Sequence, residues 1–347
     1  SSTTTVKPNI LFTLDDSGSM ARSYMPDEIS GRTGTAGYKS HLCNLIYYNP
    51  AITYVPPKNS DGTDFANSTF TNAQDDGFFS TSGSTNLDTS YRAHGGDTAQ
   101  RAYYYAFNAA ANVPAGTPPD DNYNTFNTDR NKGCYPTVNS NEPNGSIVVG
   151  GSNSTTWSKR QVTATSGPGN TDERQNFANW YTYYSSRMQM MKSATGRAFI
   201  GISADYRVGF ITINPGSSSV SSSKYLAVSD FDATQKSNWY AKLYAQDSNS
   251  STPLREALAR AGRHFAGIQT GINNGMTGDP MQYSCQQNFT ILTTDGYWNG
   301  NEGIKLDGSD IGNQDGNIAL TPRPLYDGAV VTSTNARTTE TYSVTSS

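Results

Sequence analysis

One stretch decides the fold: residues 9–20 are Asn9-Ile10-Leu11-Phe12-Thr13-Leu14-Asp15-Asp16-Ser17-Gly18-Ser19-Met20. Its apolar half predicts a buried strand, and its Asp-x-Ser-x-Ser half predicts a turn at the end of that strand. Gly18 lets the backbone bend so that the hydroxyls of Ser17 and Ser19 can both face inward. Such oxygen ligands suit a hard divalent cation such as Mg²⁺, Mn²⁺ or Ca²⁺, and suit Zn²⁺ or Cu²⁺ poorly.

The composition of the 347-residue chain is typical of a secreted surface protein. Charged residues make up only 16%, tyrosine is abundant with 22 copies, and Ser, Thr, Asn and Gly are plentiful. A net charge of -4 gives no electrostatic reason to expect nucleic acid or an anionic membrane as a partner. No stretch approaches the roughly 18 apolar residues of a spanning helix, so we expect no membrane span. The start at Ser1 is what cleavage of a secretory signal would leave.

Three cysteines, Cys43, Cys134 and Cys285, form no Cys-x-x-Cys pair, which disfavours a zinc ribbon. In an oxidising compartment we expect one disulfide. Cys43 and Cys134 are the natural pair because they lie in the same polar segment. Cys285 precedes a predicted core strand, which leaves open a buried free thiol or a bond to a cysteine elsewhere. The alternative is three unpaired thiols.

Strands and helices alternate after residue 170, which predicts an α/β fold with a doubly wound, mostly parallel sheet. The expected elements are a helix over 171–196, a buried strand at 207–213, an edge strand at 224–228, a helix at about 232–246, a helix from Thr252-Pro253 and a buried strand at 288–293. The first helix is expected to bury the stripe Phe177, Tyr181, Tyr184, Met188 and Met191. The third is expected to bury Leu254, Leu258, Ala261 and Phe265.

Polar residues of several segments are expected to meet at one edge of this sheet. Asp15 and Asp295 both follow strands, Thr252 opens a helix, and ligands bind at the carboxyl ends of parallel strands. The sequence therefore predicts one divalent-cation site whose ligands are Asp15, Ser17, Ser19, Thr252 and Asp295. The alternative is that these Asp, Ser and Thr residues are ordinary helix caps. Asp16 is expected to point outward into solvent.

The predicted domain organisation has three parts. Residues 8–20 and 170–298 form the core, residues 21–169 form a large loop-rich insertion after the first strand, and residues 299–347 form an irregular polar tail or second insertion. A loop as long as 21–169 implies a functional insertion or a subdomain. Its Tyr clusters indicate either an adhesive surface or the insertion's own core. The sheet has few strands, so we expect the domain to continue beyond residue 347.

The motif Asp15-x-Ser17-x-Ser19, Thr252 at a helix start and Thr294-Asp295-Gly296 after a strand occur in a familiar order. They resemble the metal-ion-dependent adhesion site of von Willebrand factor type A domains, over residues 8–20 and about 170–298. The resemblance implies hydroxyl ligands from Ser17, Ser19 and Thr252. It also implies that Asp15 and Asp295 bind the ion directly or through water. One coordination position would stay open for an acidic group of a partner.

A narrower resemblance is carried by Lys7-Pro8-Asn9-Ile10-Leu11-Phe12, Cys43-Asn44, Tyr47-Tyr48-Asn49-Pro50, Asn176-Phe177-Ala178-Asn179-Trp180, Ser251-Thr252-Pro253-Leu254-Arg255 and Thr294-Asp295-Gly296-Tyr297-Trp298-Asn299-Gly300. These segments resemble the PilY/PilC family of bacterial type IV pilus tip adhesins and biogenesis factors. The family implies a pilus tip position, contact with minor pilins, and a role in attachment and twitching motility. It also implies a carboxyl-terminal β-propeller, for which 347 residues leave no room.

We therefore expect a metal-dependent adhesion and assembly module at a type IV pilus tip, and not an enzyme. It would bind an acidic group of a minor pilin, or of a host or surface ligand, through Mg²⁺, with Mn²⁺ or Ca²⁺ as alternatives. The expected location is secreted, on the cell surface at the pilus tip, or associated with the outer membrane. The alternatives are a chelatase or another type A scaffold domain, and adhesion by the Tyr-rich insertion with a purely structural ion.

Overall fold

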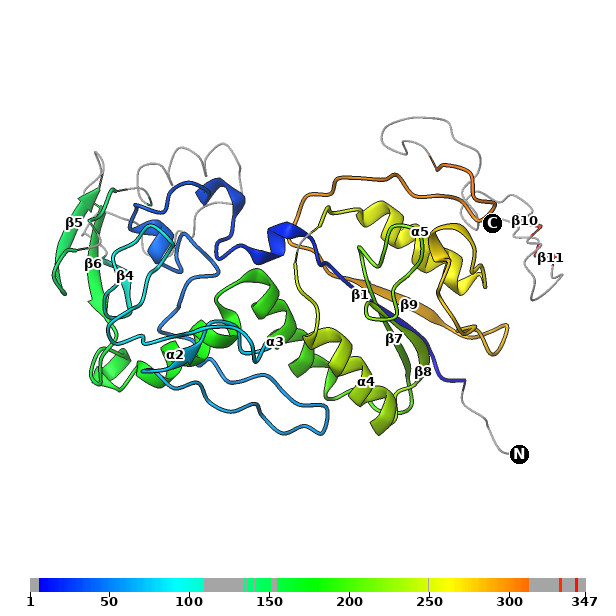
Figure 1. The fold of residues 1–347 in the computed structure, drawn as a ribbon, viewed down its shortest axis with the longest axis horizontal. Coiled ribbons are helices and arrows are strands. Elements are labelled where there is room, and N and C mark those ends of the chain that lie inside the picture. Colours follow the sequence, from blue (N-terminus) through cyan, green and yellow to red (C-terminus); the bar gives the residue numbers. More distant parts are fainter. Residues whose placement is uncertain are drawn as a thin grey trace, which may run out of the picture. The chain divides into compact units, whose positions relative to one another are not determined.

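The computed structural model describes residues 6–108, 134, 136–139, 141–150, 155–248, 250–311, 331–332 and 341–342 (Figure 1). The chain divides into two compact units. The first unit is Ser1–Gly18 with Gly201–Ser347, and the second is Ser19–Ile200. These bounds differ from the expected ones, which placed residues 170–200 with the first strand. Within the described ranges, no helix is both long and apolar enough to span a membrane.

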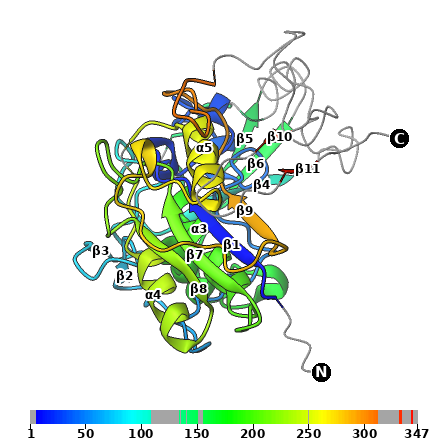
Figure 2. The same cartoon turned by 90° about the vertical axis from the view of Figure 1, so that its right-hand side faces the viewer.

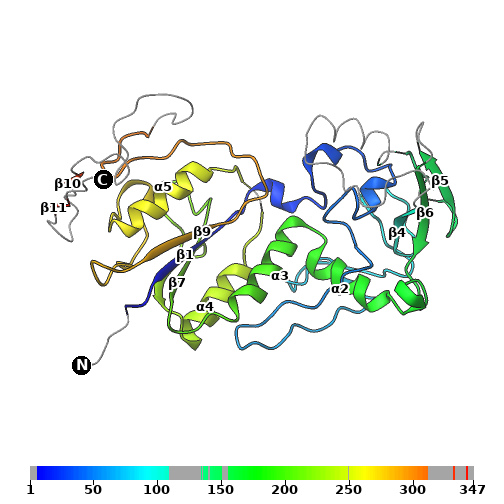
Figure 3. The same ribbon diagram turned by 180° about the vertical axis from the view of Figure 1, so that it is seen from behind.

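The first unit is built on a four-stranded sheet with the order β8-β7-β1-β9. Its strands are β1 (Asn9–Leu14), β7 (Arg207–Thr212), β8 (Tyr225–Asp230) and β9 (Asn288–Leu292). Strand β1 lies between β7 and β9 and is parallel to both, while β8 is antiparallel to β7 (Figure 3). The predicted mixed α/β fold with a mostly parallel sheet is confirmed, as are the first buried strand, the one at 207–213 and the edge strand that follows it.

Two helices cover opposite faces of this sheet (Figures 1 and 2). They are α4 (Ala233–Tyr244) and α5 (Leu254–Phe265). On one face, the ring of Trp239 in α4 packs 5.5 Å from that of Phe12. On the other face, Leu11 packs in one cluster with Ala261 of α5. Successive side chains of β1 therefore pack into the cores on opposite faces of the sheet, because side chains alternate between the two faces along a strand.

The second unit combines two helices with small antiparallel sheets. The helices are α2 (Arg174–Tyr184) and α3 (Arg187–Phe199). A three-stranded sheet has the order β4-β6-β5, formed by Tyr103–Asn108, Thr155–Gln161 and Ile147–Gly150. The remaining short elements of the chain are β2 (Ala73–Gln74), β3 (Ser84–Thr85), β10 (Val331–Thr332), β11 (Thr341–Tyr342), η1 (Gly18–Ala21), η2 (Asp27–Ile29), η3 (Gly37–Lys39), η4 (Pro168–Asn170) and η5 (Gly271–Asn273).

Tyrosines form much of the core of the second unit. One cluster holds the buried Tyr38, Tyr47, Tyr48, Tyr54, Tyr91, Tyr103, Tyr104 and Tyr105, and Tyr183 of α2 is buried as well. Several of their hydroxyls find partners inside: the Tyr47 hydroxyl lies 3.0 Å from that of Tyr91 and donates to the Tyr103 carbonyl at 2.9 Å. Of the two interpretations of the Tyr clusters, the internal core is the one that these residues support.

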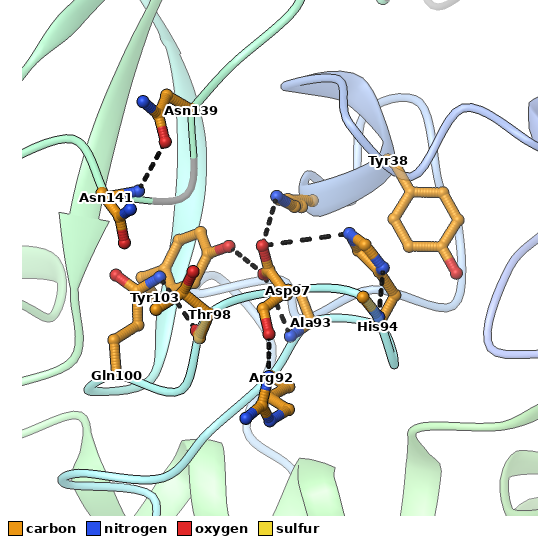
Figure 4. Close-up of polar contacts among 12 residues, drawn as sticks. Tyr38, Arg92, Ala93, His94, Asp97, Thr98, Gln100, Tyr103, Asn139 and Asn141 are labelled. Carbon is orange, nitrogen blue, oxygen red and sulfur yellow. Dashed lines mark hydrogen bonds and ion pairs between the residues drawn. The ribbon is translucent and has the colours of Figure 1, made fainter.

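A buried ion pair lies within this tyrosine core (Figure 4). The carboxylate of Asp97 accepts hydrogen bonds from Lys39 Nζ at 3.3 Å, from the backbone N–H of Ala93 at 3.3 Å and from the Tyr103 hydroxyl. The ammonium of Lys159, also fully buried, lies 4.5 Å from the centre of the Tyr103 ring. Each buried charge is thus met by an opposite charge, a hydrogen bond or an aromatic face, which is what burial demands.

The predicted disulfide between Cys43 and Cys134 is confirmed, with the two Cα atoms 6.0 Å apart. Gly37 lies against it, and its N–H donates to the Cys134 carbonyl at 2.8 Å. A Cβ atom at position 37 would collide with Cys134, so this close approach requires glycine. Cys285 is free and exposed, so the idea that it is a buried thiol is wrong.

The helix expected over 171–196 is two helices. Ser186 has an extended backbone and its hydroxyl accepts the N–H of Gln189 at 3.2 Å, which caps a new helix at Arg187. The second helix runs past Gly196 to Phe199. Residues of α2, among them Phe177 and Trp180, join the tyrosine core, which is why these helices belong to the second unit.

Burial differs from the prediction in two elements of the first unit. Strand β9 was expected to be buried, but Phe289 and Ile291 are 49% and 40% exposed because β9 stands last in the strand order. In α5, Leu258 is 51% exposed, whereas Ala257, Arg260 and His264 are buried. The buried face of α5 therefore differs from the predicted apolar stripe: it leaves out Leu258 and includes the polar side chains of Arg260 and His264.

Removing the Cys43–Cys134 disulfide should destabilise the second unit. The bond closes a loop of 91 residues, and the chain-entropy model gives such a loop about 4 kcal/mol of stabilisation, less any strain. We expect Cys43→Ser with Cys134→Ser to lower the free energy of unfolding in urea by roughly that amount. Cys285→Ser is the matched control and should leave it unchanged. Equal stability of all three proteins would contradict the expectation.

Candidate metal site at the carboxyl edge of the sheet

The ends of the parallel strands β1 and β9 bring the first predicted ligands together. Thr293, just after β9, donates its N–H to the Thr13 carbonyl at 3.0 Å. Asp15, just after β1, donates its N–H to the Thr293 hydroxyl at 3.3 Å. Burial is the main cause that raises the pKa of Asp15, and the charge of Asp295 adds a smaller rise, which places Asp295 within electrostatic reach. The structure therefore brings Asp15 and Asp295 to one edge of the sheet, as predicted.

The loop before α5 lies against the turn after β1. Ser17 forms a parallel bridge with Ser250, and the N–H of Gly18 donates to the Ser250 carbonyl at 2.8 Å. Thr252 follows two residues later and is buried. These backbone contacts place the predicted ligand Thr252 beside the turn that carries Ser17.

The same loop is also fastened to the loop after β9. The N–H of Thr252 donates to Asn299 Oδ1 at 2.8 Å, and the N–H of Asn299 donates to the Thr252 carbonyl at 2.9 Å. Three loops, after β1, before α5 and after β9, are thus joined by direct hydrogen bonds. They carry four of the five predicted ligands, Asp15, Ser17, Thr252 and Asp295. Ser19 follows Gly18 in η1 and is the first residue of the second unit.

The carboxylate of Asp15 is fully buried and only partly satisfied. Its Oδ1 accepts the N–H of Ser17 at 2.8 Å, while its Oδ2 has no hydrogen-bond partner in the described part of the chain. Burial raises the pKa of Asp15, although hydrogen bonding from Ser17 and the nearby Thr294 hydroxyl opposes the rise. A buried carboxylate oxygen without a partner is costly, and a bound cation would supply the missing partner. The donor set therefore fits a hard divalent cation.

Asp16 does not point into solvent, and that expectation is wrong. The side chain is fully buried, and its Oδ2 accepts Lys224 Nζ at 2.5 Å. Its Oδ1 accepts both the N–H and the side-chain Nδ2 of Asn214 at 3.0 Å. Asn214 Nδ2 also donates to the Ser251 carbonyl at 2.7 Å. Asp16 therefore connects the loops after β1, after β7 and before α5.

Sequence reasoning missed the residues that position these loops: Asn214, Lys224, Thr293 and Asn299. No spacing links them to the Asp-x-Ser-x-Ser turn, although Asn214 and Asn299 both follow strands at the expected edge. Within the described ranges, no group of three or more His, Cys, Asp or Glu side chains could hold a metal ion. The candidate site is of another kind, because most of its ligands are hydroxyls.

The fold and this edge define an α/β unit with an oxygen-lined candidate cation site. The chain is 33% identical over 314 residues to the type IV pilus biogenesis factor PilY1 of Pseudomonas aeruginosa strain UCBPP-PA14, which covers 85% of this chain and 23% of that protein. It is 32% identical over 354 residues to PilY1 of strain PAO1, which covers 93% of this chain and 26% of that protein. The chain thus spans about a quarter of the length of the curated relatives it matches. No family model and no solved structure matches it.

Replacing Asp16 should destabilise the first unit, because the change would leave Lys224 and Asn214 without their shared acceptor. We expect Asp16→Ala to lower the free energy of unfolding by about 1–3 kcal/mol, the usual cost of unpaired buried polar groups. Chemical denaturation of the full chain measures it. Asp310→Ala removes an exposed carboxylate of the same unit and should change stability little. If the two variants are equally stable, Asp16 does not hold the loops together.

Proposed function

We propose that the first unit is a metal-dependent adhesion and assembly module of a type IV pilus tip protein. The observation that carries the proposal is the buried Asp15 carboxylate, whose Oδ2 has no partner in the described part of the chain, at the point where three loops are joined. Asp15, Ser17, Ser19, Thr252 and Asp295 would hold the ion. The likeness of most of the chain to proteins named type IV pilus biogenesis factors supports the biological setting.

The ligand set suggests what the ion would do. Two carboxylates, Asp15 and Asp295, balance the charge of a divalent cation, and the hydroxyls add oxygen without adding charge. When bound, the cation supplies a Lewis-acidic position that can accept one more oxygen, such as that of a partner carboxylate. Asp16, Asn214 and Asn299 connect the loops by hydrogen bonds, so the proposed site would be in place before any partner binds. We propose Mg²⁺ as the ion, with Mn²⁺ or Ca²⁺ as alternatives.

The proposed partners and location follow from this setting. The acidic group would belong to a minor pilin or another part of the pilus tip complex, or to a host or surface ligand. The protein would act outside the cell at the pilus tip, with outer-membrane association as the alternative. It would support attachment, pilus assembly and twitching motility by binding, with no catalytic step. The disulfide of the second unit is consistent with an oxidising compartment.

Titration with Mg²⁺, Mn²⁺ and Ca²⁺ tests the ion directly. We expect calorimetry of the full chain to show one binding site, and we expect Asp15→Ala and Asp295→Ala to weaken binding at least tenfold because each removes one of two charged ligands. Asp310→Ala is the control and should bind like wild type. Absence of binding by all three cations, or unchanged binding by Asp15→Ala, would refute the site.

Attachment assays test the function. In the full protein, Asp295→Ala should reduce attachment or pilus assembly while the purified chain stays folded, because the variant loses the ion and with it the contact to the acidic partner. Circular dichroism of the same variant checks the fold. Cells that carry Asp310→Ala should behave like wild type. Normal attachment and normal pili with Asp295→Ala would mean that the ion has only a structural role or none.

A further inference from the structure

A small cavity of about 270 Å³ lies in the first unit, apart from the predicted ion ligands. Its walls come from the serine loop after β7 (Ser217–Ser219), from Glu256 and Arg260 of α5, and from Ile272 and Ile304. The volume suffices for one small functional group of a ligand, such as a side chain of a partner. Neither the fold nor the proposed ion accounts for the polar groups that line it.

Arg260 is the side chain that gives this cavity its chemistry. It is only 3% exposed. Its Nε donates to the Ile272 carbonyl at 2.9 Å, and its Nη2 donates to Glu256 Oε1 at 2.6 Å. Its Nη1 has no hydrogen-bond partner in the described part of the chain. A buried guanidinium nitrogen without an acceptor is costly, so the cavity calls for a ligand that accepts hydrogen bonds.

Glu256 does not compete for that position. Its Oε1 is bound by Arg260, and its Oε2 accepts Asn301 Nδ2 at 2.6 Å. Both carboxylate oxygens are therefore engaged, while the guanidinium keeps an unused donor. Ser217 and Ser218 of the exposed serine loop add hydroxyls at the wall of the cavity, whereas the Ser219 hydroxyl donates to the Asn274 carbonyl at 3.3 Å.

The charge balance selects the kind of acceptor. Hydrogen bonds that involve an ionised group are roughly twice as strong as those between two neutral groups, and a carboxylate also brings the charge opposite to that of the guanidinium. A phosphate would bring a second negative charge close to Glu256, which a carboxylate does not. A carboxylate is therefore the ligand group that the cavity favours.

The cavity shares its loops with the candidate ion site. The serine loop begins three residues after Asn214, and α5 begins two residues after Thr252. Burial lowers the pKa of Arg260, whereas the charges of Glu256 and, more weakly, Asp16 act to raise it. Arg260 thus lies within electrostatic reach of the residue that connects the loops of the ion site.

We propose that the Arg260 cavity is a second acidic-group site, which binds a carboxylate of the same partner whose other acidic group reaches the ion. This inference rests on the proposed function for its partner, but not for its chemistry. The partner would then present two acidic side chains, and only one of them would depend on the cation.

Titration of the full chain with glutarate in EDTA, followed by ¹H–¹⁵N NMR, tests the cavity without any cation. We expect saturable shifts of the Ser217–Ser219 and Gly271 amides, and at least tenfold weaker binding of glutaramide, which has the same length and no charge. Arg260→Lys should weaken glutarate binding at least fivefold, because a single ammonium cannot keep the bonds to Ile272 and Glu256 and still offer the ligand a donor. Arg255→Lys, on the same helix and outside the cavity, is the matched control.

Ser218→Trp provides a second variant, because it fills the cavity from an exposed loop and leaves the hydrogen bonds of Arg260 intact. It should abolish the glutarate shifts while the protein stays folded. Equal shifts with glutaramide, or glutarate binding that neither Arg260→Lys nor Ser218→Trp changes, would overturn the proposal. Because EDTA removes the cation, glutarate binding supports the cavity even if the metal titration fails. Intact metal binding without glutarate binding overturns the cavity alone.

Discussion

The arrangement of loops at the carboxyl edge of the sheet depends on one buried group, the carboxylate of Asp16. A fully buried carboxylate is tolerated only where its oxygens are bound, and the partners of Asp16 come from two distant segments. Lys224 precedes β8 and Asn214 follows β7, so both loops must take their observed positions before the carboxylate is satisfied. Through Asn214 the same network reaches Ser251, next to Thr252. We therefore infer that these loops take their observed positions when the first unit folds.

Asp15 and Asp16 are neighbours in the chain with opposite roles. Both oxygens of Asp16 are engaged by this protein's own donors, so its carboxylate needs no ligand to be satisfied. Asp15 is equally buried, but its Oδ2 has no partner in the described residues. Of these two buried carboxylates, Asp16 connects the loops, and Asp15 keeps an oxygen that a ligand could bind. The cost of the unsatisfied oxygen is what a cation would remove.

Patterns of neighbouring residues in the sequence predicted much of this fold. Most of what they missed depends on contacts between residues that are far apart in the sequence. The apolar run before Asp15 and the amphipathic helix at 233–244 carry their structure in adjacent residues, so both were found. The burial of Asp16 depends on residues 198 and 208 positions away, for which the sequence has no spacing rule. The exposure of Phe289 likewise depends on which strand ends the sheet. The break at Ser186 was missed because the apolar spacing continues across it.

The sequence could point to one edge of the sheet because Asp15, Thr252 and Asp295 each follow a strand or open a helix, and a parallel sheet collects such residues there. That they hold an ion stays a prediction. Arg260 could not be found in this way. Its neighbours on α5 indicate an ordinary amphipathic helix. Only the structure shows that Arg260 lines a cavity and that its buried Nη1 has no partner among the described residues. Buried functional arginines are thus invisible to periodicity, because a buried position on a helix is predicted to be apolar.

The net charge of -4 bears on how an acidic partner could be recognised. A weakly acidic chain repels an acidic partner slightly at a distance, so long-range steering does not favour the encounter. In the proposed binding mode, attraction would arise only at short range, where a cation or the Arg260 guanidinium would meet a carboxylate directly. Salt screens the distant repulsion more than it screens a partly buried contact. Recognition of this kind suits a partner that is already held nearby in an assembly, where encounter rate matters less than the lifetime of the contact.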